Sequence, residues 1–478
     1  MRSQNRRACL YSVAILGILI GIAGCDSAPP SMPNASGSRR YTTESLFANA
    51  VTSAAAIVRS QLDYGQCALW AQQVAAIDGS PDDRYAVDSV LIERTWASLY
   101  SGSLEDIEQA LNQARADQNA LQIAQLLVVR AWTYSYITAV WGDVPFSAAD
   151  QGSGGVLAPS YDRQSAIYDA LLKDLAQSSL LMANATTGGF GTSDPVYAGN
   201  LEKWRRFANS LRARLALELS RADASRAKSE VAAAIAAGGF ASNDDDATIR
   251  WLGDGTNDNP WSRATDNLRL SKTLVDTLLS LADPRLSVYA QPASLSGQYA
   301  GAPNGLTVQQ GATYVDVASP IAANVARKDM PSSLLTFAEF SLIKAEAAER
   351  GWISGSAAQY YADGIRASLQ HWGIAAADID VYLAQPSVQY ATGAAGQTQI
   401  ALQNWIGLYT QGVDAWREWR RSGQPHLVAV SSAQTSPPAI PRRLPYPRSE
   451  LLRNSANAQR AIAAQGGATL TDRTWIDK

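Results

Sequence analysis

Apolar side chains recur at steps of three and four residues over most of the chain, which is the spacing of amphipathic helices. The clearest stretch, 401–425, carries these apolar residues on one face: Leu402, Trp405, Tyr409, Val413 and Trp416. Gly423 and Pro425 predict its end, and Gly412 in the middle of the pattern predicts a division into two shorter helices. Because each tryptophan ring can remove about 150–250 Å² from water, we interpret the stretch as part of the protein core.

The same periodicity predicts further helices at 43–63, 85–100, 104–116, 122–141, 161–182, 201–220, 272–282, 333–350 and 356–372. Ser103 and Ser160 are the predicted N-caps of two of them. The helix at 122–141 is apolar over a wide surface, which predicts neighbours on more than one side. The arginine-rich helix at 201–220 is interpreted as solvated or paired with carboxylates rather than as an anion site.

The two helices at 333–350 and 356–372 are joined by a short turn and carry small residues where their backbones would approach. This arrangement is typical of a tetratricopeptide unit. No strict period of 34 residues runs through the chain, so the repeats are expected to be degenerate. The predicted fold class is therefore mostly α, built from degenerate tetratricopeptide-like helical pairs with a loop-rich, minor β ligand-binding face.

Two segments break the helical pattern. Residues 286–330 are predicted to form turns and short strands. Residues 240–266 hold many Asp, Asn and Gly residues and no helical period, and such loops carry function more often than helices do. Trp251 and Trp261, with Asp258 and Asn259 between them, are the first candidates for ligand contact. The alternative is that the two rings pack on the core. The spacing of Asp244, Asp245 and Asp246 does not match an EF-hand loop, so no metal is expected.

The first residues are interpreted as a targeting segment. Arginines precede an apolar run, 8–20, that is too short to span a bilayer, and Ile22-Ala23-Gly24-Cys25 follows. We therefore predict a lipoprotein signal peptide at 1–24 and lipidation at Cys25, which would anchor the protein to a membrane. The Pro-, Ser- and Gly-rich residues 25–40 are expected to form a lipidated flexible tether. Residues 41–478 are predicted to be one domain.

Composition narrows the function further. The chain is 46% hydrophobic and 17% charged with a formal net charge of −3, which indicates a globular protein without a basic stripe for nucleic acid. After removal of the leader, only Cys25 and Cys67 remain, so no intrachain disulfide is expected and Cys67 is predicted to be buried.

Enzymatic motifs are absent from the sequence. It contains two histidines, His371 and His426, and no H-E-x-x-H, G-x-S-x-G, C-x-x-C or Walker loop. A glycosidase needs only two carboxylates, but no acidic cluster stands in a recognisable catalytic setting. We therefore expect neither an enzyme nor a cofactor.

Several separated stretches resemble one family. AWREWRRSGQPHL and IPRRLPYPRSELLRN near the C-terminus, WGDVPF at 141–146, and WRRFANSLRARLAL within 201–220 are similar to the SusD/RagB family of nutrient-binding outer-membrane lipoproteins. TFAEFSLIKAEAAERGW and YYADGIRASLQHWGI also match. The C-terminal ending is typical of a separate branch of that family. The resemblance extends from about residue 85 to about residue 467 and includes the lipobox, which is the Ile22-Ala23-Gly24-Cys25 motif at the predicted cleavage site.

The resemblance implies a role and partners. The protein would lie at the outer membrane, facing the cell surface, as the lid-like partner of a SusC-like TonB-dependent transporter, and would bind an oligomeric nutrient, in many relatives a glycan. Asp26 would then favour surface export rather than inner-membrane retention. Because relatives often place ligand contacts early in the chain, Asp83, Arg84 and Trp96 are a second candidate group. Two alternatives stay open: an envelope scaffold that binds only protein partners, and a surface glycosidase.

Overall fold

The computed structural model describes residues 41–149, 155–264 and 266–478. Residues Thr42–Lys478 form one compact unit. The predicted signal peptide, the lipidation site Cys25 and the tether at 25–40 lie outside the described residues. Regular structure in the described part of the chain is almost entirely helical, with two small two-stranded sheets. This confirms the predicted fold class.

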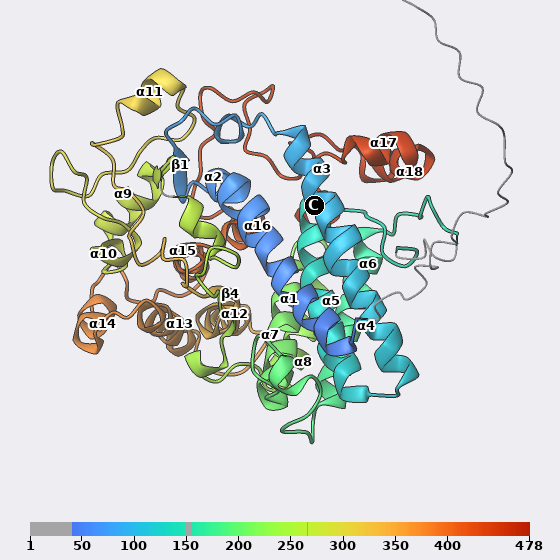
Figure 1. Ribbon diagram of the computed structural model, residues 1–478. Helices are drawn as coiled ribbons and strands as arrows, with labels where there is room; N and C mark the ends of the chain where they lie inside the picture. Colours follow the sequence, from blue (N-terminus) through green and yellow to red (C-terminus); the bar gives the residue numbers. More distant parts are fainter. Residues whose placement is uncertain (1–40, 150–154, 265) are drawn as a thin grey trace, which may run out of the picture. The chain divides into compact units, whose positions relative to one another are not determined.

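The first helix is longer than predicted. α1 (Thr43–Ile57) is capped by Thr42 and continues without a break through a π-helical segment, Val58–Cys67, into α2 (Ala68–Trp70). In Figure 1 this continuous rod runs diagonally through the middle of the unit. Its inward face buries Phe47, Ala50 and Val58 completely. Cys67 is also fully buried, as predicted.

The next helices correct two predicted starts. α3 (Ser89–Ser98) begins after its cap Asp88, and not at residue 85, because Tyr85 adopts a left-handed backbone with φ of 65°. A π-helical segment, Leu99–Leu104, joins α3 to α4 (Glu105–Ala116), so Ser103 lies inside a helix and is not an N-cap. Its hydroxyl instead lies 2.9 Å from that of Ser53 on α1.

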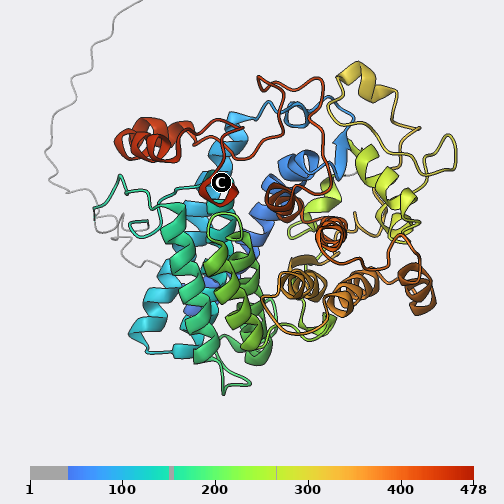
Figure 2. The ribbon, with the colours of Figure 1, turned by 180° about the vertical axis from the view of Figure 1, so that it is seen from behind.

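Four helices form the side of the unit drawn in cyan and green: α5 (Ala120–Trp141), α6 (Gln164–Leu181), α7 (Leu201–Glu218) and α8 (Ala224–Ala236). Each packs on the next in chain order, and α5 also packs on α4 and α7 (Figure 2). The prediction that the apolar α5 has neighbours on several sides is confirmed. The predicted cap at Ser160 is wrong, since α6 begins after Arg163.

The opposite side contains the predicted helical pair, α12 (Phe337–Glu349) and α13 (Ala357–His371). Gly364 lies where they cross: a Cβ atom there would stand 2.7 Å from Cγ of Leu342 and 3.1 Å from the carbonyl oxygen of Ala338. A small residue is therefore required at this contact. α14 (Ala376–Leu383) and α15 (Ala394–Gly407) follow, and both α15 and α14 pack on α13.

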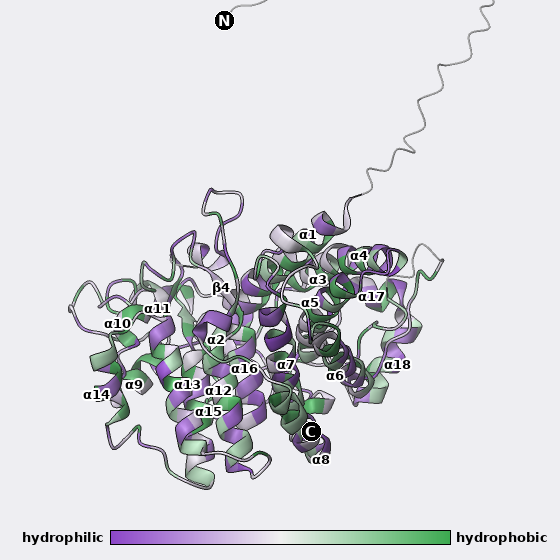
Figure 3. Cartoon of the chain, turned by 90° about the horizontal axis from the view of Figure 1, so that it is seen from below, coloured by the Kyte–Doolittle hydropathy of each residue, from purple (hydrophilic) through white to green (hydrophobic). Residues whose placement is uncertain are grey.

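The division at Gly412 is confirmed. α15 ends at Gly407 and α16 (Gly412–Ser422) begins at Gly412 itself, where a Cβ atom would stand 2.6 Å from the backbone nitrogen of Ala68. Trp405 and Trp416 are fully buried, so this stretch belongs to the core as predicted. Figure 3 shows α16 and α7, both with strongly hydrophilic residues, in the middle of the unit. Those residues form the buried charge network described below.

The irregular region connects the two sides. β1 (Val74–Ala76) pairs antiparallel with β3 (Leu268–Leu270), and β2 (Ala247–Ile249) pairs antiparallel with β4 (Ser332–Leu335). β4 occupies the predicted start of the helix at 333, and Thr336 caps α12 instead. α9 (Lys272–Ser280) lies as predicted. The turns predicted in 286–330 are confirmed, but the predicted short strands are replaced by α10 (Leu286–Tyr289), α11 (Val308–Ala312) and isolated β-bridges that pair Ala290 with Ile321, Arg269 with Pro320 and Ser271 with Ala302.

The chain ends in two short helices, α17 (Arg448–Arg453) and α18 (Ser455–Gln465). Figure 1 shows them in red beside α3, and α17 contacts α3 directly. Segments from the two ends of the unit therefore lie side by side.

Candidate functional site

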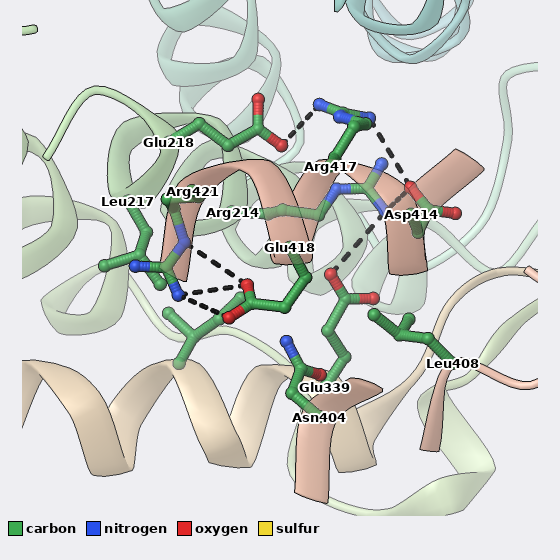
Figure 4. A pocket seen from close by; sticks show the side chains of 11 residues that line it. Arg214, Leu217, Glu218, Glu339, Asn404, Leu408, Asp414, Arg417, Glu418 and Arg421 are labelled. Carbon is green, nitrogen blue, oxygen red and sulfur yellow. Dashed lines mark hydrogen bonds and ion pairs between the residues drawn. The ribbon is translucent and has the colours of Figure 1, made fainter. Parts of the chain in front are cut away.

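A buried network of charged side chains lies between α7, α12 and α16 (Figure 4). Its centre is Asp414, in the first turn of α16. One carboxylate oxygen accepts a 2.6 Å hydrogen bond from the hydroxyl of Tyr136, and the other lies 3.4 Å from both Arg214 and Arg417. Arg59 reaches the same carboxylate at 3.2 Å. Asp414 is thus the counter-charge of three arginines.

Burial and ion pairing set the ionisation of this network. Burial alone would raise the pKa of Asp414, but Arg214, Arg59 and Arg417 together hold it below the ordinary value. Burial raises the pKa of Glu339 to about 7, although Arg214 opposes the shift. One carboxyl of the network is therefore held charged by several arginines, while another is poised to take up a proton near neutrality.

The same network extends along α16, where Arg421 binds Glu346 of α12 at 2.6 Å and Glu418 at 2.9 Å. The enclosed cavity has a volume of about 30 Å³, which is room for about one or two water molecules. A nutrient oligomer does not fit there. The network is therefore a structural joint between helices rather than a binding site.

The tryptophans of the irregular region lie in the core. Trp251 is 4% exposed and donates its indole N–H to the hydroxyl of Ser332 on β4 at 2.9 Å. Trp261 is 2% exposed and lies between the rings of Tyr64 and Tyr409. This placement is the packing alternative of the sequence analysis. Ligand contact by either ring stays a prediction.

Asp258 and Asn259 shape the loop that carries these rings. Asp258 accepts a hydrogen bond from the backbone N–H of Gly255 at 2.7 Å and pairs with Lys328 at 3.2 Å. Asn259 is buried, and its side-chain amide donates to the carbonyl groups of Val325 and Arg327. Both side chains therefore have loop partners, and a role in ligand binding stays a prediction for them too.

The second candidate group separates into two places. Asp83 is fully buried and accepts hydrogen bonds from the backbone N–H groups of Ala76 and Gly305 and from the side chain of Asn304, while burial raises its pKa to about 6. Arg84 is half-buried and donates to the carbonyl of Gly79. Trp96, on α3, lies apart from them and lines an open hollow.

That hollow has a volume of about 540 Å³ and lies between α3 and its π-helical continuation on one side and the 449–454 segment on the other. Its polar lining includes Glu93, Glu105, Glu450, Arg453 and Asn454. Beneath it, the ring of Trp96 lies 4.7 Å from that of Tyr100 and 5.2 Å from that of Trp141, centroid to centroid. An aromatic cluster thus forms a stiff floor for the hollow.

A second hollow of about 580 Å³ adjoins the first, between α3 and α17. Both are lined by Glu93, Ala97, Ser449 and Arg453, and a hydrogen bond from the backbone N–H of Ser449 to Glu93 joins two of these shared residues. We call the two adjoining hollows together the α3–α17 groove. The volume of each hollow is in the range of small-molecule sites. This groove brings a sequence-predicted residue, Trp96, together with charged and polar groups.

Sequence reasoning missed most of this groove. Local sequence pattern predicts no ligand contact for four of its lining residues and assigns them only to a helix or to the PRSELLRN motif: Tyr100, Arg448, Glu450 and Arg453. The available signal was that this motif combines three charged side chains with Leu452 on a six-residue helix, which has little core to bury. The motif packs against α3, which lies more than 300 residues earlier in the chain. A contact between such distant segments cannot be predicted from the periodicity of either one.

Metal chemistry finds no support in the described part of the chain, where no group of three or more His, Cys, Asp or Glu side chains is placed to hold an ion. His371 instead lies 3.2 Å from Asp246, at the end of α13. Within the same residues, no helix is both long and apolar enough to cross a bilayer.

Comparison with solved structures shows the same fold elsewhere. A chitin-binding protein is 26% identical, with a TM-score of 0.80, covering 89% of this chain and 98% of that one. A chitin-binding SusD homologue from Flavobacterium johnsoniae is 22% identical, with a TM-score of 0.82 over 91% of this chain and 98% of its own. A SusD homologue from Bacteroides ovatus ATCC 8483 is also 22% identical, with a TM-score of 0.80 over 91% and 99%.

The sequence itself matches a family model. No curated protein sequence matches the chain. Residues 33–447, however, match the SusD-like family described as "Starch-binding associating with outer membrane". The match covers most of the sequence and agrees with the motif resemblance described above. The chain therefore belongs to the SusD-like family.

Proposed function

We propose that this protein is a lipid-anchored outer-membrane receptor that binds an oligosaccharide without altering it and delivers it to a SusC-like TonB-dependent transporter. The observation that carries the proposal is the α3–α17 groove, an open site with an aromatic floor, in a member of a family described as starch-binding. Two structural neighbours of this chain are themselves named as chitin-binding proteins.

The groove offers the two kinds of contact that a glycan needs. Sugar rings have apolar C–H faces that pack on aromatic side chains, and hydroxyl groups that pair with carboxylates and amides. Trp96 and the half-buried Tyr100 supply the first kind. Glu93 and Glu450 supply the second. These contacts hold a ligand by shape and hydrogen bonding, and they require no covalent step.

Hydrogen bonds hold lining residues of the groove on both its α3 side and its α17 side. The hydroxyl of Tyr100 donates to the carbonyl of Pro145 at 2.8 Å, and that of Tyr161 donates to Glu450 at 2.7 Å. The backbone N–H of Ser449 donates to Glu93 across the groove. Because these bonds fix the lining before a ligand arrives, binding costs little ordering entropy.

Membrane attachment would come from the N-terminal segment. Lipidation at Cys25 and the Pro- and Ser-rich residues that follow would hold the binding domain just off the membrane surface. The outer-membrane association in the family description supports this location. A transporter partner follows from the same family membership, and it would take the bound oligosaccharide across the membrane.

The test is calorimetry of the purified chain with chito-oligosaccharides and malto-oligosaccharides. Ala97 is exposed and lines both halves of the groove, so Ala97→Trp should block a ligand without disturbing the core. Ala233→Trp, at an exposed position on α8, is the matched control. We expect the first variant to lose glycan affinity and the second to keep it.

Other outcomes separate the alternatives. Absence of affinity for any glycan would contradict the proposal and favour a scaffold that binds only proteins. Release of shortened products during the titration would favour a glycosidase. Glycan affinity unchanged in Ala97→Trp would move the site away from the α3–α17 groove.

A further inference from the structure

The half of the groove between α3 and α17 has an unusual charge distribution. It is lined on the α17 side by Arg448, Ser449, Leu452 and Arg453, and on the α3 side by Arg94 together with Ser89, Val90, Glu93 and Ala97. The side chains of Arg94, Arg448 and Arg453 are all exposed. Glu93 is the only acidic residue lining this half in the described structure, so positive charge is in excess.

The three arginines also differ from the other arginines that the structure describes on helices. Every arginine of α7 and α16 takes part in a hydrogen bond or an ion pair, as with Arg212 to Glu230 at 2.6 Å and Arg421 to Glu346 at 2.6 Å. Within the described residues, Arg94, Arg448 and Arg453 have neither kind of partner. The nearest acids in sequence are Glu93 beside Arg94 and Glu450 between Arg448 and Arg453. Glu93 accepts a hydrogen bond from the backbone N–H of Ser449 at 3.2 Å, and Glu450 accepts one from the hydroxyl of Tyr161 at 2.7 Å. Three guanidinium groups therefore line one hollow without an ion-pair partner within 4.0 Å among the described residues.

Guanidinium groups select for particular ligand chemistry. Their planar arrangement of N–H donors matches the paired oxygens of a carboxylate or a sulfate, and such charge-assisted bonds are stronger than neutral ones. A neutral sugar hydroxyl does not need three cations. The arginines thus indicate a ligand that carries negative charge at this end of the groove.

The rest of the hollow indicates what surrounds that charge. Val90 is 62% exposed and Leu452 is 68% exposed, and both line the same half of the groove as the arginines. At its other end the groove continues over Trp96 and Tyr100. An occupant with acidic groups along one edge and apolar ring faces along the other fits both halves. Acidic sugars in an oligomer have this character, whereas an acidic protein surface has no need of the aromatic half.

We infer that the ligand of this protein is an acidic oligosaccharide, with a uronate carboxylate or a sugar sulfate bound by Arg94, Arg448 and Arg453 and the following ring packed toward Trp96 and Tyr100. This inference rests on the proposed function and adds the chemical class of the glycan. Neutral chitin and starch fragments would then bind more weakly than acidic ones of equal length.

The test compares three probes by calorimetry with the full chain: an oligogalacturonate, a chondroitin sulfate oligosaccharide and a neutral chito-oligosaccharide of matched length. The double variant Arg94→Gln with Arg448→Gln removes two cations that line the hollow between α3 and α17 but not the hollow over Trp96, and Arg250→Gln removes an exposed arginine outside the groove. We expect the double variant to lose about ten- to a hundredfold in affinity for an acidic probe and to leave the neutral probe unchanged. Preference between the first two probes separates carboxylate from sulfate.

Two further measurements keep the result interpretable. Raising the salt concentration should weaken binding of the acidic probe to the unmodified protein and have less effect on the double variant. Arg94→Lys with Arg448→Lys should restore part of the affinity, because charge returns without the planar donor set. Thermal unfolding confirms that each variant is folded.

The outcomes distinguish the two proposals. Binding of neutral probes as tightly as acidic ones, or equal acidic binding by wild type and the double variant, would overturn the acidic-ligand inference while leaving glycan binding intact. Absence of binding to all three probes would overturn both. Transporter binding that is lost in the double variant, with glycan binding unchanged, would show that the arginines meet an acidic protein surface instead.

Discussion

The Oδ2 atom of Asp414 and the Nη2 atom of Arg59 lie 3.2 Å apart, although 355 positions separate the two residues in the chain, and neither side chain is more than 2% exposed. Arg59 belongs to the continuation of α1, and Asp414 lies in the first turn of α16. The same carboxylate accepts a hydrogen bond from Tyr136 on α5 and pairs with Arg214 on α7. The buried carboxylate of Asp414 on α16 therefore contacts the continuation of α1, α5 and α7.

Asp414→Asn should destabilise the fold strongly. The substitution keeps the shape of the side chain but leaves Arg59, Arg214 and Arg417 buried without their shared counter-charge. Removing one partner of a buried ion pair costs about 3–5 kcal/mol, so we expect the free energy of unfolding to fall by that amount. Urea denaturation followed by circular dichroism measures it.

The control is an exposed ion pair. Asp380 and Arg366 lie 2.8 Å apart with side chains that are 66% and 41% exposed. Asp380→Asn should lower the free energy of unfolding by less than about 1 kcal/mol, because solvent screens exposed pairs. Equal losses in the two variants would mean that the buried network contributes nothing beyond a surface pair.

α16 shows which features of the fold can be predicted from the sequence and which cannot. The apolar face with Trp405 and Trp416, the core position and the division at Gly412 all follow from local pattern and are confirmed. The burial of Asp414 and Arg417 on the polar face does not follow. Their partners come from helices that are distant in the chain, and a helical period carries no information about which polar face meets which.

Glu339→Gln should change how stability depends on pH. Burial raises the pKa of Glu339 to about 7 in the folded protein, whereas an unfolded glutamate has a pKa of about 4.3. The folded state therefore holds an extra proton between these values. The contribution of Glu339 to the free energy of unfolding is fully present below about pH 4.3 and is lost as pH rises through about 7.

Glutamine stays neutral at every pH, so the variant avoids that loss. We expect the free energy of unfolding of Glu339→Gln, relative to wild type, to rise by about 2–3 kcal/mol between pH 5 and pH 8. Urea denaturation at the two pH values tests this. Glu202→Gln, at a side chain that is 50% exposed, is the control. A similar rise in the control would refute burial as the cause.

Gly364→Ala should destabilise the α12–α13 pair even though alanine favours helices. The added Cβ would meet Cγ of Leu342 at 2.7 Å and the carbonyl oxygen of Ala338 at 3.1 Å. Overpacking of this kind costs about 1–3 kcal/mol, and the better helix propensity of alanine offsets about 1 kcal/mol at most. Thermal unfolding should therefore show a lower Tm.

Gly102 provides the matched control for that substitution. It lies in the π-helical segment between α3 and α4, and no atom would stand within 4 Å of an added Cβ. Gly102→Ala should leave Tm unchanged or raise it, because only the helix propensity changes. A lower Tm in both variants would show that packing at the α12–α13 crossing is not the reason.

Trp261→Ala should unfold the protein more readily rather than act on a ligand alone. The ring is 2% exposed and packs against Tyr64 and Tyr409. Loss of a buried tryptophan costs about 3–5 kcal/mol, which urea denaturation can measure. Leu252→Ala, at a neighbouring side chain that is 71% exposed, should change stability by no more than about 0.5 kcal/mol. Equal small effects would indicate that the ring is not part of the core.

The two tryptophan groups show why sites are harder to predict than helices. Trp251 and Trp261 lie in a polar loop, and Trp96 lies on a helix, so local composition favoured the first pair. All three rings are buried, at 4% exposed for Trp251, 2% for Trp261 and 6% for Trp96, but Trp96 also lines the open groove. Whether a ring faces a hollow depends on the packing of α17 against α3, which the sequence near the ring does not contain.

Cys25→Ser should release the protein from the membrane. A serine hydroxyl in place of the thiol cannot form the diacylglycerol thioether that anchors a bacterial lipoprotein. Each methylene buried in a bilayer contributes about 0.8 kcal/mol, so loss of the acyl chains removes the predicted source of membrane affinity. We expect the wild type in the outer-membrane fraction and the variant in the soluble envelope fraction or still joined to its leader.

Cys67→Ser is the matched control, because Cys67 is buried in the domain and its replacement should leave the protein in the membrane fraction. Mass spectrometry of the mature N-terminus checks the acyl group directly. An unmodified N-terminus, or equal membrane association of Cys25→Ser and wild type, would contradict the lipid anchor while leaving glycan binding by the domain to be judged on its own measurement.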